Sequence, residues 1–206
     1  MLLQSATQMC PTIVRDYPEW HLGRSDYALW YIEVDQPELI QYLDEIQTRF
    51  SDLLLPKQRQ YHITLFVCGF LQPAVKQYDD DFQIQQLQQQ IKLLEALQLT
   101  AFQLEITQID SFSSALFLQI QDQQGVLAQI RQQFAQVSAE IAALEYCPHI
   151  TLGLYREAWS GDIVLQRIQQ LPLKSIKIQV KKMTFGYYKA QILQGLLYPY
   201  QQIELG

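Results

Sequence analysis

The chain is poor in histidine, in cysteine and in charge. Three of its 206 residues are histidine, three are cysteine, and 17% are charged. Cys10, Cys68 and Cys147 are an odd number and lack the spacing of a metal site, so we expect reduced thiols without a disulfide framework or a metal centre. Reduced thiols indicate a cytoplasmic protein. Because histidine is scarce, the position of each one is informative.

Long apolar runs are also missing. No stretch approaches the roughly 18 consecutive apolar residues of a membrane span, and the first residues lack the basic and apolar regions of a signal peptide. We therefore expect no membrane partner. The length suits an irregular N-terminal segment over residues 1–25, interrupted by Pro11 and Pro18, and a single bilobal domain over residues 26–206. We expect a monomer.

Basic residues are too few for a protein that holds long nucleic acids. Fifteen Lys and Arg oppose 21 Asp and Glu, which gives a formal net charge of −6. Binding to long duplexes depends on a basic surface, so the composition argues against it. Residues 171–206 nevertheless carry five lysines against one glutamate. A local basic segment on an acidic protein suits a small anionic ligand better than a polymer.

The spacing of apolar residues predicts an α+β protein. Glutamine is abundant, with 34 copies, and the QQLQQQ tract keeps a helical period, which favours a solvated helix face. The predicted strands are 27–34, 60–70, 102–109, 115–121, 148–155 and 175–186. The predicted helices are one between Asp35 and Pro56 and those over 82–98, 123–144 and 163–170, and residues 191–205 add a strand or a hairpin.

One tetrapeptide, His-Ile-Thr-Leu, occurs twice, at His62–Leu65 and at His149–Leu152. Each copy lies in an apolar, β-branched run that is typical of a strand. Side chains alternate faces along a strand, so in each copy the histidine and the threonine point the same way. Two such strands side by side would present two imidazoles and two hydroxyls to one cleft.

This pattern suits phosphate chemistry. Histidine titrates near neutral pH, so His62 and His149 can serve as a general acid and a general base. The hydroxyls of Thr64 and Thr151 can donate hydrogen bonds to phosphate oxygens. The alternative is that these are core histidines satisfied by backbone groups and ordinary strand threonines. The duplication favours the catalytic interpretation.

Other candidates surround the motifs. Phe66 and Tyr155 share the expected face of the motif residues and would either stack on a base or pack in the core. Arg156 fits a solvent-exposed residue better than a phosphate ligand, although we keep it as a candidate. Residues Trp20–Arg24, which include the third histidine, suggest a lid over the cleft as a further hypothesis.

The two HITL copies, with Gly69 seven residues after His62 and Pro148 before His149, resemble the signature of the 2H (two-histidine) phosphoesterase superfamily, in its 2′-5′ RNA ligase-like and cyclic phosphodiesterase branch. The resemblance extends from about Tyr27 to Gly186. It implies a bilobal α+β fold in which two antiparallel-type sheets, flanked by helices, surround a central cleft. Several ligase-like members carry an arginine five residues after the second histidine, where this chain has Leu154.

Together, the chemistry and the resemblance predict a metal-independent phosphodiesterase that needs no cofactor. Its expected substrate is a 2′,3′-cyclic or related ribose cyclic phosphate, carried by a small nucleotide or an RNA end. One alternative is a 2′-5′ RNA ligase or an RNA 3′-end phosphodiesterase. Another is a non-catalytic nucleotide- or RNA-binding module, although a binding module has no need for two imidazoles.

Overall fold

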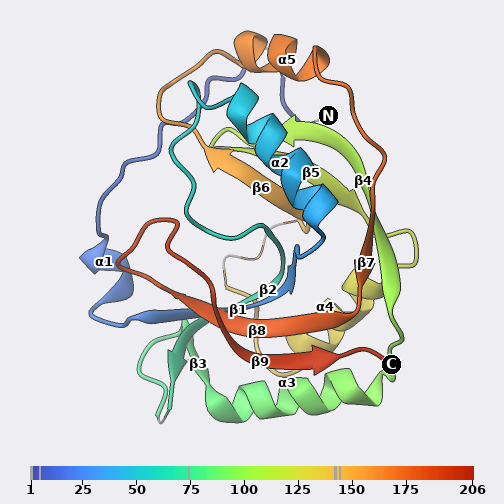
Figure 1. The fold of residues 1–206 in the computed structure, drawn as a ribbon. Helices are drawn as coiled ribbons and strands as arrows, with labels where there is room; N and C mark the ends of the chain where they lie inside the picture. Colours follow the sequence, from blue (N-terminus) through green and yellow to red (C-terminus); the bar gives the residue numbers. More distant parts are fainter. Residues whose placement is uncertain (1, 5, 74, 142, 144) are drawn as a thin grey trace.

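The structure, a computed structural model, describes residues 2–4, 6–73, 75–141, 143 and 145–206. Within this part of the chain, helices and strands are interspersed, with β2 and β3, β4 and β5, and β7 to β9 following one another directly (Figure 1). The helices are α1 (Pro18–His21), α2 (Pro37–Arg49), α3 (Ile84–Ala96), α4 (Val126–Ala135) and α5 (Gly161–Gln169). The strands are β1 (Asp26–Glu33), β2 (His62–Gln72), β3 (Asp81–Gln83), β4 (Phe102–Ser111), β5 (Ala115–Gln121), β6 (His149–Leu154), β7 (Lys177–Val180), β8 (Lys182–Lys189) and β9 (Tyr198–Glu204).

The strands form one curled sheet in the order β7-β4-β5-β6-β2-β1-β8-β9, and β3 pairs with the far end of β2. Every pairing is antiparallel except that of β2 with β3. The sheet has two halves, β7-β4-β5-β6 and β2-β1-β8-β9, which meet where β6 pairs with β2 through Ile63 and Ile150. Figure 1 shows the two halves curling toward each other. The predicted α+β fold is confirmed.

Helices cover the outer faces of both halves. Figure 1 shows α2 and α5 over the half that contains β6, and α3 and α4 below the half that contains β1. The inward faces of these helices fill the core, since Leu43 of α2 and Phe134 of α4 are fully buried. The Trp30 ring of β1 stacks on Phe134 at 4.9 Å between ring centroids. This packing fixes the outer face of the sheet and leaves the inner face to form a site.

One glutamine of the QQLQQQ tract lies in the core. Gln90 of α3 is fully buried, and its side-chain oxygen accepts a hydrogen bond from the indole N–H of Trp30 at 2.8 Å. The prediction of a solvated face is therefore wrong for this residue. The buried indole N–H needs an acceptor, and a long amide side chain provides one.

The predicted helix over 123–144 is wrong beyond Ala135. After Ala135 the chain turns back, because the Glu140 carboxylate accepts hydrogen bonds from the guanidinium of Arg131 and from the backbone N–H of Val67. Those contacts with β2 replace further helical turns. Positions 142 and 144 of the predicted helix lie outside the described residues.

The single strand predicted over 175–186 is two strands. β7 pairs with β4, and β8 pairs with β1, so the chain passes at Lys181 from the edge of one half to the other half. The apolar alternation of Ile176, Ile178 and Val180 breaks at the consecutive lysines Lys181 and Lys182 and resumes one position out of phase at Met183 and Phe185, so the prediction missed a boundary that the sequence contains. The short strand β3 and the one-turn helix α1, which lies in the segment expected to be irregular, were not predicted.

At Gly69, strand β2 lies very close to the backbone of the loop that follows it. Its φ is +109°, and a Cβ at this position would overlap the backbone oxygen of Asp80. We expect Gly69→Ala to lower the free energy of unfolding by about 3 kcal/mol or more, from backbone strain and steric overlap together. Urea denaturation measures this change.

Gly125 provides the matched control. Its φ is +71°, but an added Cβ would meet no atom within 4 Å. Gly125→Ala should therefore cost only the conformational strain, about 1–2 kcal/mol. Equal losses in the two variants would contradict the close approach at Gly69.

Candidate active site

The structure brings the four predicted motif side chains together. Ile63 pairs with Ile150 in antiparallel register, and both side chains are fully buried. This register places the neighbours of these residues on the opposite face of the sheet, with His62 across from Thr151 and Thr64 across from His149. Directly opposite positions are about 4.5–5.5 Å apart in such a pair. The two motifs therefore form one cross-strand cluster on the inner face.

The two imidazoles are held in the same way. Nδ1 of His62 donates to the backbone oxygen of Gln60 at 2.9 Å, and Nδ1 of His149 donates to that of Cys147 at 2.8 Å. In each case the acceptor lies two residues before the histidine. The bond fixes the ring and the tautomer, so that Nε2 carries the lone pair. No described residue makes a hydrogen bond to either Nε2, and both remain able to exchange protons.

Each motif strand contains a bulge directly after its threonine. On β2, Thr64 lies opposite Tyr31 and Phe66 opposite Trp30, which leaves Leu65 as an extra residue. On β6 the pairing with β5 skips Leu152 in the same way. A bulge reverses the alternation of side chains that follow it. The sequence prediction of which side chains face the cleft is therefore wrong for the residues that follow each threonine.

The bulges explain the positions of two candidates. Phe66 is buried in the core, its ring centroid 5.8 Å from that of Phe134, and it does not line the cavity beside the motifs that is described below. Tyr155 is also fully buried, and its hydroxyl forms a 2.6 Å hydrogen bond with Ser111. Both residues belong to the packing alternative that the sequence left open.

Arg156 also lies away from the cluster. Its guanidinium donates from Nε and Nη2 to the backbone oxygen of Leu54, at 3.0 and 2.8 Å. Leu154, which occupies the arginine position of several ligase-like proteins, faces the cavity described next. The positive charge of this site must therefore come from elsewhere in the chain.

A cavity of about 450 Å³ lies beside the motif cluster. Its size suits a small organic ligand. Three motif residues, His62, Thr64 and Thr151, line it. His149 is not among the lining residues, although the strand register places it across from Thr64. The other lining residues are Arg15, Tyr17, Trp20, Lys57, Arg59, Gln60, Leu154, Tyr188, Ala190, Ile192, Leu193 and Gln194.

Two cations that sequence reasoning missed stand next to His62. Lys57 lies over the Tyr61 ring at 3.0 Å, and Arg59 lies over the Tyr188 ring at 3.9 Å. Burial lowers the pKa of Lys57 to about 8 and also lowers the pKa of Arg59. The polar run PKQRQ, which Tyr61 separates from the first HITL, was the available signal, although it is equally typical of an ordinary loop.

These surroundings favour neutral imidazoles. Burial is the main cause that lowers the pKa of His62 to about 4, and the charges of Arg59, His149 and Lys57 act in the same direction. The hydrogen bond to Gln60 opposes this shift. Burial also lowers the pKa of His149, whose ring packs edge-on against Phe112 at 5.1 Å. An anion bound in the cavity would reverse part of both shifts.

The third histidine lies outside the cluster. His21 is buried, and its Nε2 is 2.9 Å from the Asp16 carboxylate. In the segment proposed as a lid, Trp20 lines the cavity, whereas Arg24 is paired with Asp80 and Asp81. The lid hypothesis therefore keeps only its aromatic residue at the site.

Two further features follow from the described part of the chain. It contains no cluster of three or more His, Cys, Asp or Glu side chains suited to hold a metal ion. None of its helices combines the length and the apolar character that crossing a membrane requires.

The fold and the paired His-x-Thr strands are those of the two-histidine phosphoesterase superfamily. The chain belongs to the 2′-5′ RNA ligase superfamily, whose model matches residues 35–191. This confirms the resemblance seen in the sequence. No curated protein sequence matches the chain significantly.

Solved structures share the fold. LigT of E. coli, in its complex with 3′-AMP, is 15% identical and superposes with a TM-score of 0.61 over 88% of this chain and 98% of LigT. TT0787 of Thermus thermophilus is 13% identical, with a TM-score of 0.60 over 87% of this chain and 97% of that protein. A phosphoesterase structure that is 16% identical has a TM-score of 0.55 over 88% and 98% of the two chains.

The charge of Arg59 should contribute to the low pKa of His62, in addition to burial. We expect the pKa of His62 to rise in Arg59→Met, because a charge that disfavours the imidazolium is removed, and to stay near the wild-type value in Arg59→Lys, which keeps that charge. Proton NMR of the three histidine ring signals, assigned by substitution, measures these values. An equal shift in both variants would show that packing, and not charge, sets the pKa.

Proposed function

We propose that this protein hydrolyses a ribose cyclic phosphodiester, such as a 2′,3′-cyclic nucleotide, by metal-independent acid–base catalysis. The observation that supports this most strongly is the matched geometry of His62 and His149. Each imidazole is fixed by a backbone carbonyl through Nδ1, and the two lie in one cross-strand cluster with two threonines. A binding module would gain nothing from two imidazoles with free Nε2 atoms.

The reaction needs two proton transfers. One imidazole takes a proton from water, and the water oxygen attacks phosphorus. The bond between phosphorus and one ribose oxygen breaks, and the second imidazole donates a proton to that oxygen. The product is a phosphomonoester, and each histidine ends with the proton state that the other had at the start.

His62 suits the base, and His149 suits the acid. Burial, together with the charges of Arg59, His149 and Lys57, disfavours a proton on His62, so this imidazole is neutral and able to accept one. For His149, burial alone lowers the pKa. A phosphate anion bound between the histidines stabilises the imidazolium form of His149.

Four groups hold the phosphate in this proposal. The hydroxyls of Thr64 and Thr151 donate to the non-bridging oxygens, where negative charge must be stabilised in the transition state. Arg59 and Lys57 supply positive charge from the same cavity wall. They supply the positive charge that an arginine supplies in several ligase-like proteins at the position where this chain has Leu154.

The first test is hydrolysis of 2′,3′-cyclic AMP in the presence of EDTA. We expect turnover by the wild type, and a loss of about 10²-fold or more in both His62→Ala and His149→Ala, because each substitution removes one proton transfer. Chromatographic separation of substrate and product measures the rate.

Gln103→Ala, on the exposed side of β4, is the control and should keep wild-type activity. Loss of activity in EDTA alone would contradict the metal-free mechanism. Full activity in either histidine variant would contradict the paired roles.

The pH dependence follows from the two lowered pKa values. Because His62 must be neutral, kcat/KM should rise as the pH passes about 4. Because His149 must be protonated, kcat/KM should fall again as the pH passes its pKa, which burial places below the ordinary value. We therefore expect a bell-shaped profile with its maximum on the acid side of neutrality, which describes the coupled pair. A maximum on the alkaline side of neutrality would exclude these roles.

A further inference from the structure

Strand β2 loses its β6 neighbour directly after the start of the first motif. In the described part of the chain, β6 pairs with β2 only at Ile63 and Ile150. The next residues of β2 form the bulge in which Leu65 is the extra residue. A backbone group that is buried without a partner costs about 1–3 kcal/mol. The backbone groups of the bulge on the β6 side therefore need partners from another part of the chain.

Side chains provide these partners. The hydroxyl of Tyr146 donates to the backbone oxygen of Thr64 at 3.0 Å, and the guanidinium of Arg131 donates to the backbone oxygen of Leu65 at 2.6 Å. In a regular strand two consecutive carbonyls point to opposite neighbours. Here both are held from the same side, since the Arg131 guanidinium stacks on the Tyr146 ring at 3.8 Å. The two side chains therefore bind the shape that the bulge gives to the backbone.

A third side chain holds the first two in place. The Glu140 carboxylate accepts two hydrogen bonds from Arg131, at 3.0 and 2.6 Å, and a third from the backbone N–H of Val67 at 3.1 Å. Both side chains of the ion pair are largely buried, with exposed fractions of 16% and 13%. A bidentate pair of this kind fixes direction as well as distance. We call Arg131, Glu140 and Tyr146 the bulge clamp.

The second motif strand is held differently after its threonine. The backbone N–H of Leu55 donates to the backbone oxygen of Leu154 at 2.8 Å. A backbone hydrogen bond stays in place when side chains are substituted. Support after Thr151 is therefore independent of side chains, whereas support at Thr64 depends on the clamp. The two threonines form a matched pair for an experiment.

We propose that the bulge clamp positions Thr64 for catalysis. A β-branched side chain has few rotamers, so the direction of its hydroxyl follows from its backbone. By holding the backbone of the bulge, the clamp directs the Thr64 hydroxyl into the cavity that this residue lines with His62. The clamp residues themselves do not line that cavity. The proposal rests on the proposed function, in which the Thr64 hydroxyl donates to the phosphate.

Removing one hydroxyl from the clamp tests this role. Tyr146→Phe keeps the ring that packs on Arg131 but releases the carbonyl of Thr64. We expect kcat for 2′,3′-cyclic AMP to fall about 10-fold, with a smaller change in KM, because a misplaced hydroxyl stabilises the transition state less well. Thr64→Val, which removes the whole donor, should lower kcat about 10²-fold.

A double-mutant cycle separates positioning from a general effect on the fold. In the Thr64→Val background, adding Tyr146→Phe should change kcat by less than about 2-fold, because no hydroxyl remains to be positioned. In the Thr151→Val background, the same addition should still lower kcat about 10-fold. Equal losses in the two backgrounds would overturn the proposal.

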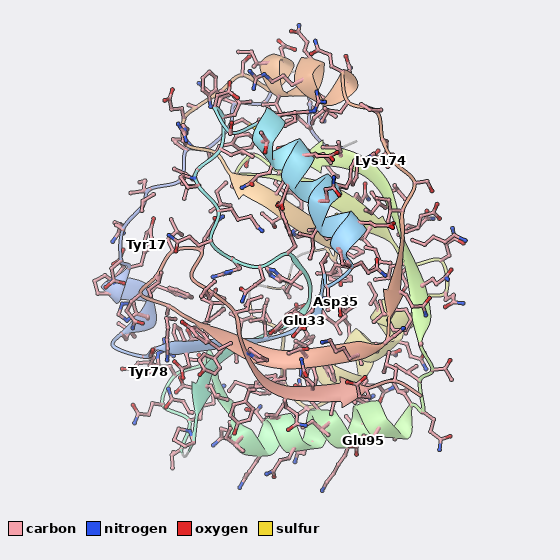
Figure 2. All side chains as sticks on the ribbon, in the orientation of Figure 1. Tyr17, Glu33, Asp35, Tyr78, Glu95 and Lys174 are labelled. Carbon is pink, nitrogen blue, oxygen red and sulfur yellow. The ribbon has the colours of Figure 1, made fainter. Side chains whose placement is uncertain are left out.

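Two variants accompany the cycle. Tyr78→Phe makes the same substitution on an exposed side chain at the edge of the molecule near β3 (Figure 2), and it should keep the wild-type kcat. Arg131→Lys keeps the charge beside Glu140 but lacks the planar fork. It should lower kcat as Tyr146→Phe does, with the same dependence on Thr64. A loss that is independent of Thr64 would contradict the clamp.

His149 needs a separate check, because Tyr146 precedes Cys147, whose backbone oxygen fixes this imidazole. Proton NMR should give the same pKa for His149 in Tyr146→Phe as in the wild type. A shifted pKa would place the effect on the histidine instead of the threonine and overturn the proposal.

The methyl signals of Thr64 and Thr151 report on the clamp without turnover. In methyl-labelled protein, Tyr146→Phe should move the Thr64 signal and leave the Thr151 signal unchanged, each signal being assigned by its absence from the valine variant. An unmoved Thr64 signal refutes the positioning role, whatever the activity. If the wild type hydrolyses no cyclic phosphate and the Thr64 signal still moves, the proposed function fails and the hold of the clamp on Thr64 stands.

Discussion

The pairing of Ile63 with Ile150 is the contact on which the site depends. It is where the two halves of the curled sheet meet, and both side chains are fully buried. Side chains alternate across a sheet, so burial of these two residues places a histidine and a threonine from each strand on the inner face. A register shift of one residue would turn all four into the core. Burial of the isoleucine in each tetrapeptide therefore determines where its histidine and threonine lie.

Two kinds of polar group surround the motif cluster, namely backbone carbonyls and cationic side chains. Backbone carbonyls fix both imidazoles through Nδ1, so no ionisable side chain is needed to orient either ring. Burial is the main cause that keeps His62 neutral, and the charges of Arg59 and Lys57, which line the same cavity, act in the same direction. In the proposed function these two cations also hold the phosphate. This arrangement differs from a site in which an arginine follows the second histidine, a position that Leu154 occupies here.

The comparisons show a fold that is kept at low sequence identity. The matched region, residues 35–191, holds both motif strands, and structures only 13–16% identical keep the fold over most of this chain. Tyr17 and Trp20 precede the matched region and Gln194 follows it, and all three line the same cavity as His62.

The sequence by itself determined the α+β class, most helices and strands, and the pairing of two histidines with two threonines, because all of these depend on local periodicity and on a repeated tetrapeptide. It did not reveal the bulges at Leu65 and Leu152, which bury Phe66 and Tyr155, because a bulge depends on the neighbouring strand. Cavity positions such as Arg59, Tyr17 and Gln194 were equally hidden. Their side chains reach the cavity from distant segments, and only tertiary packing decides which segments meet.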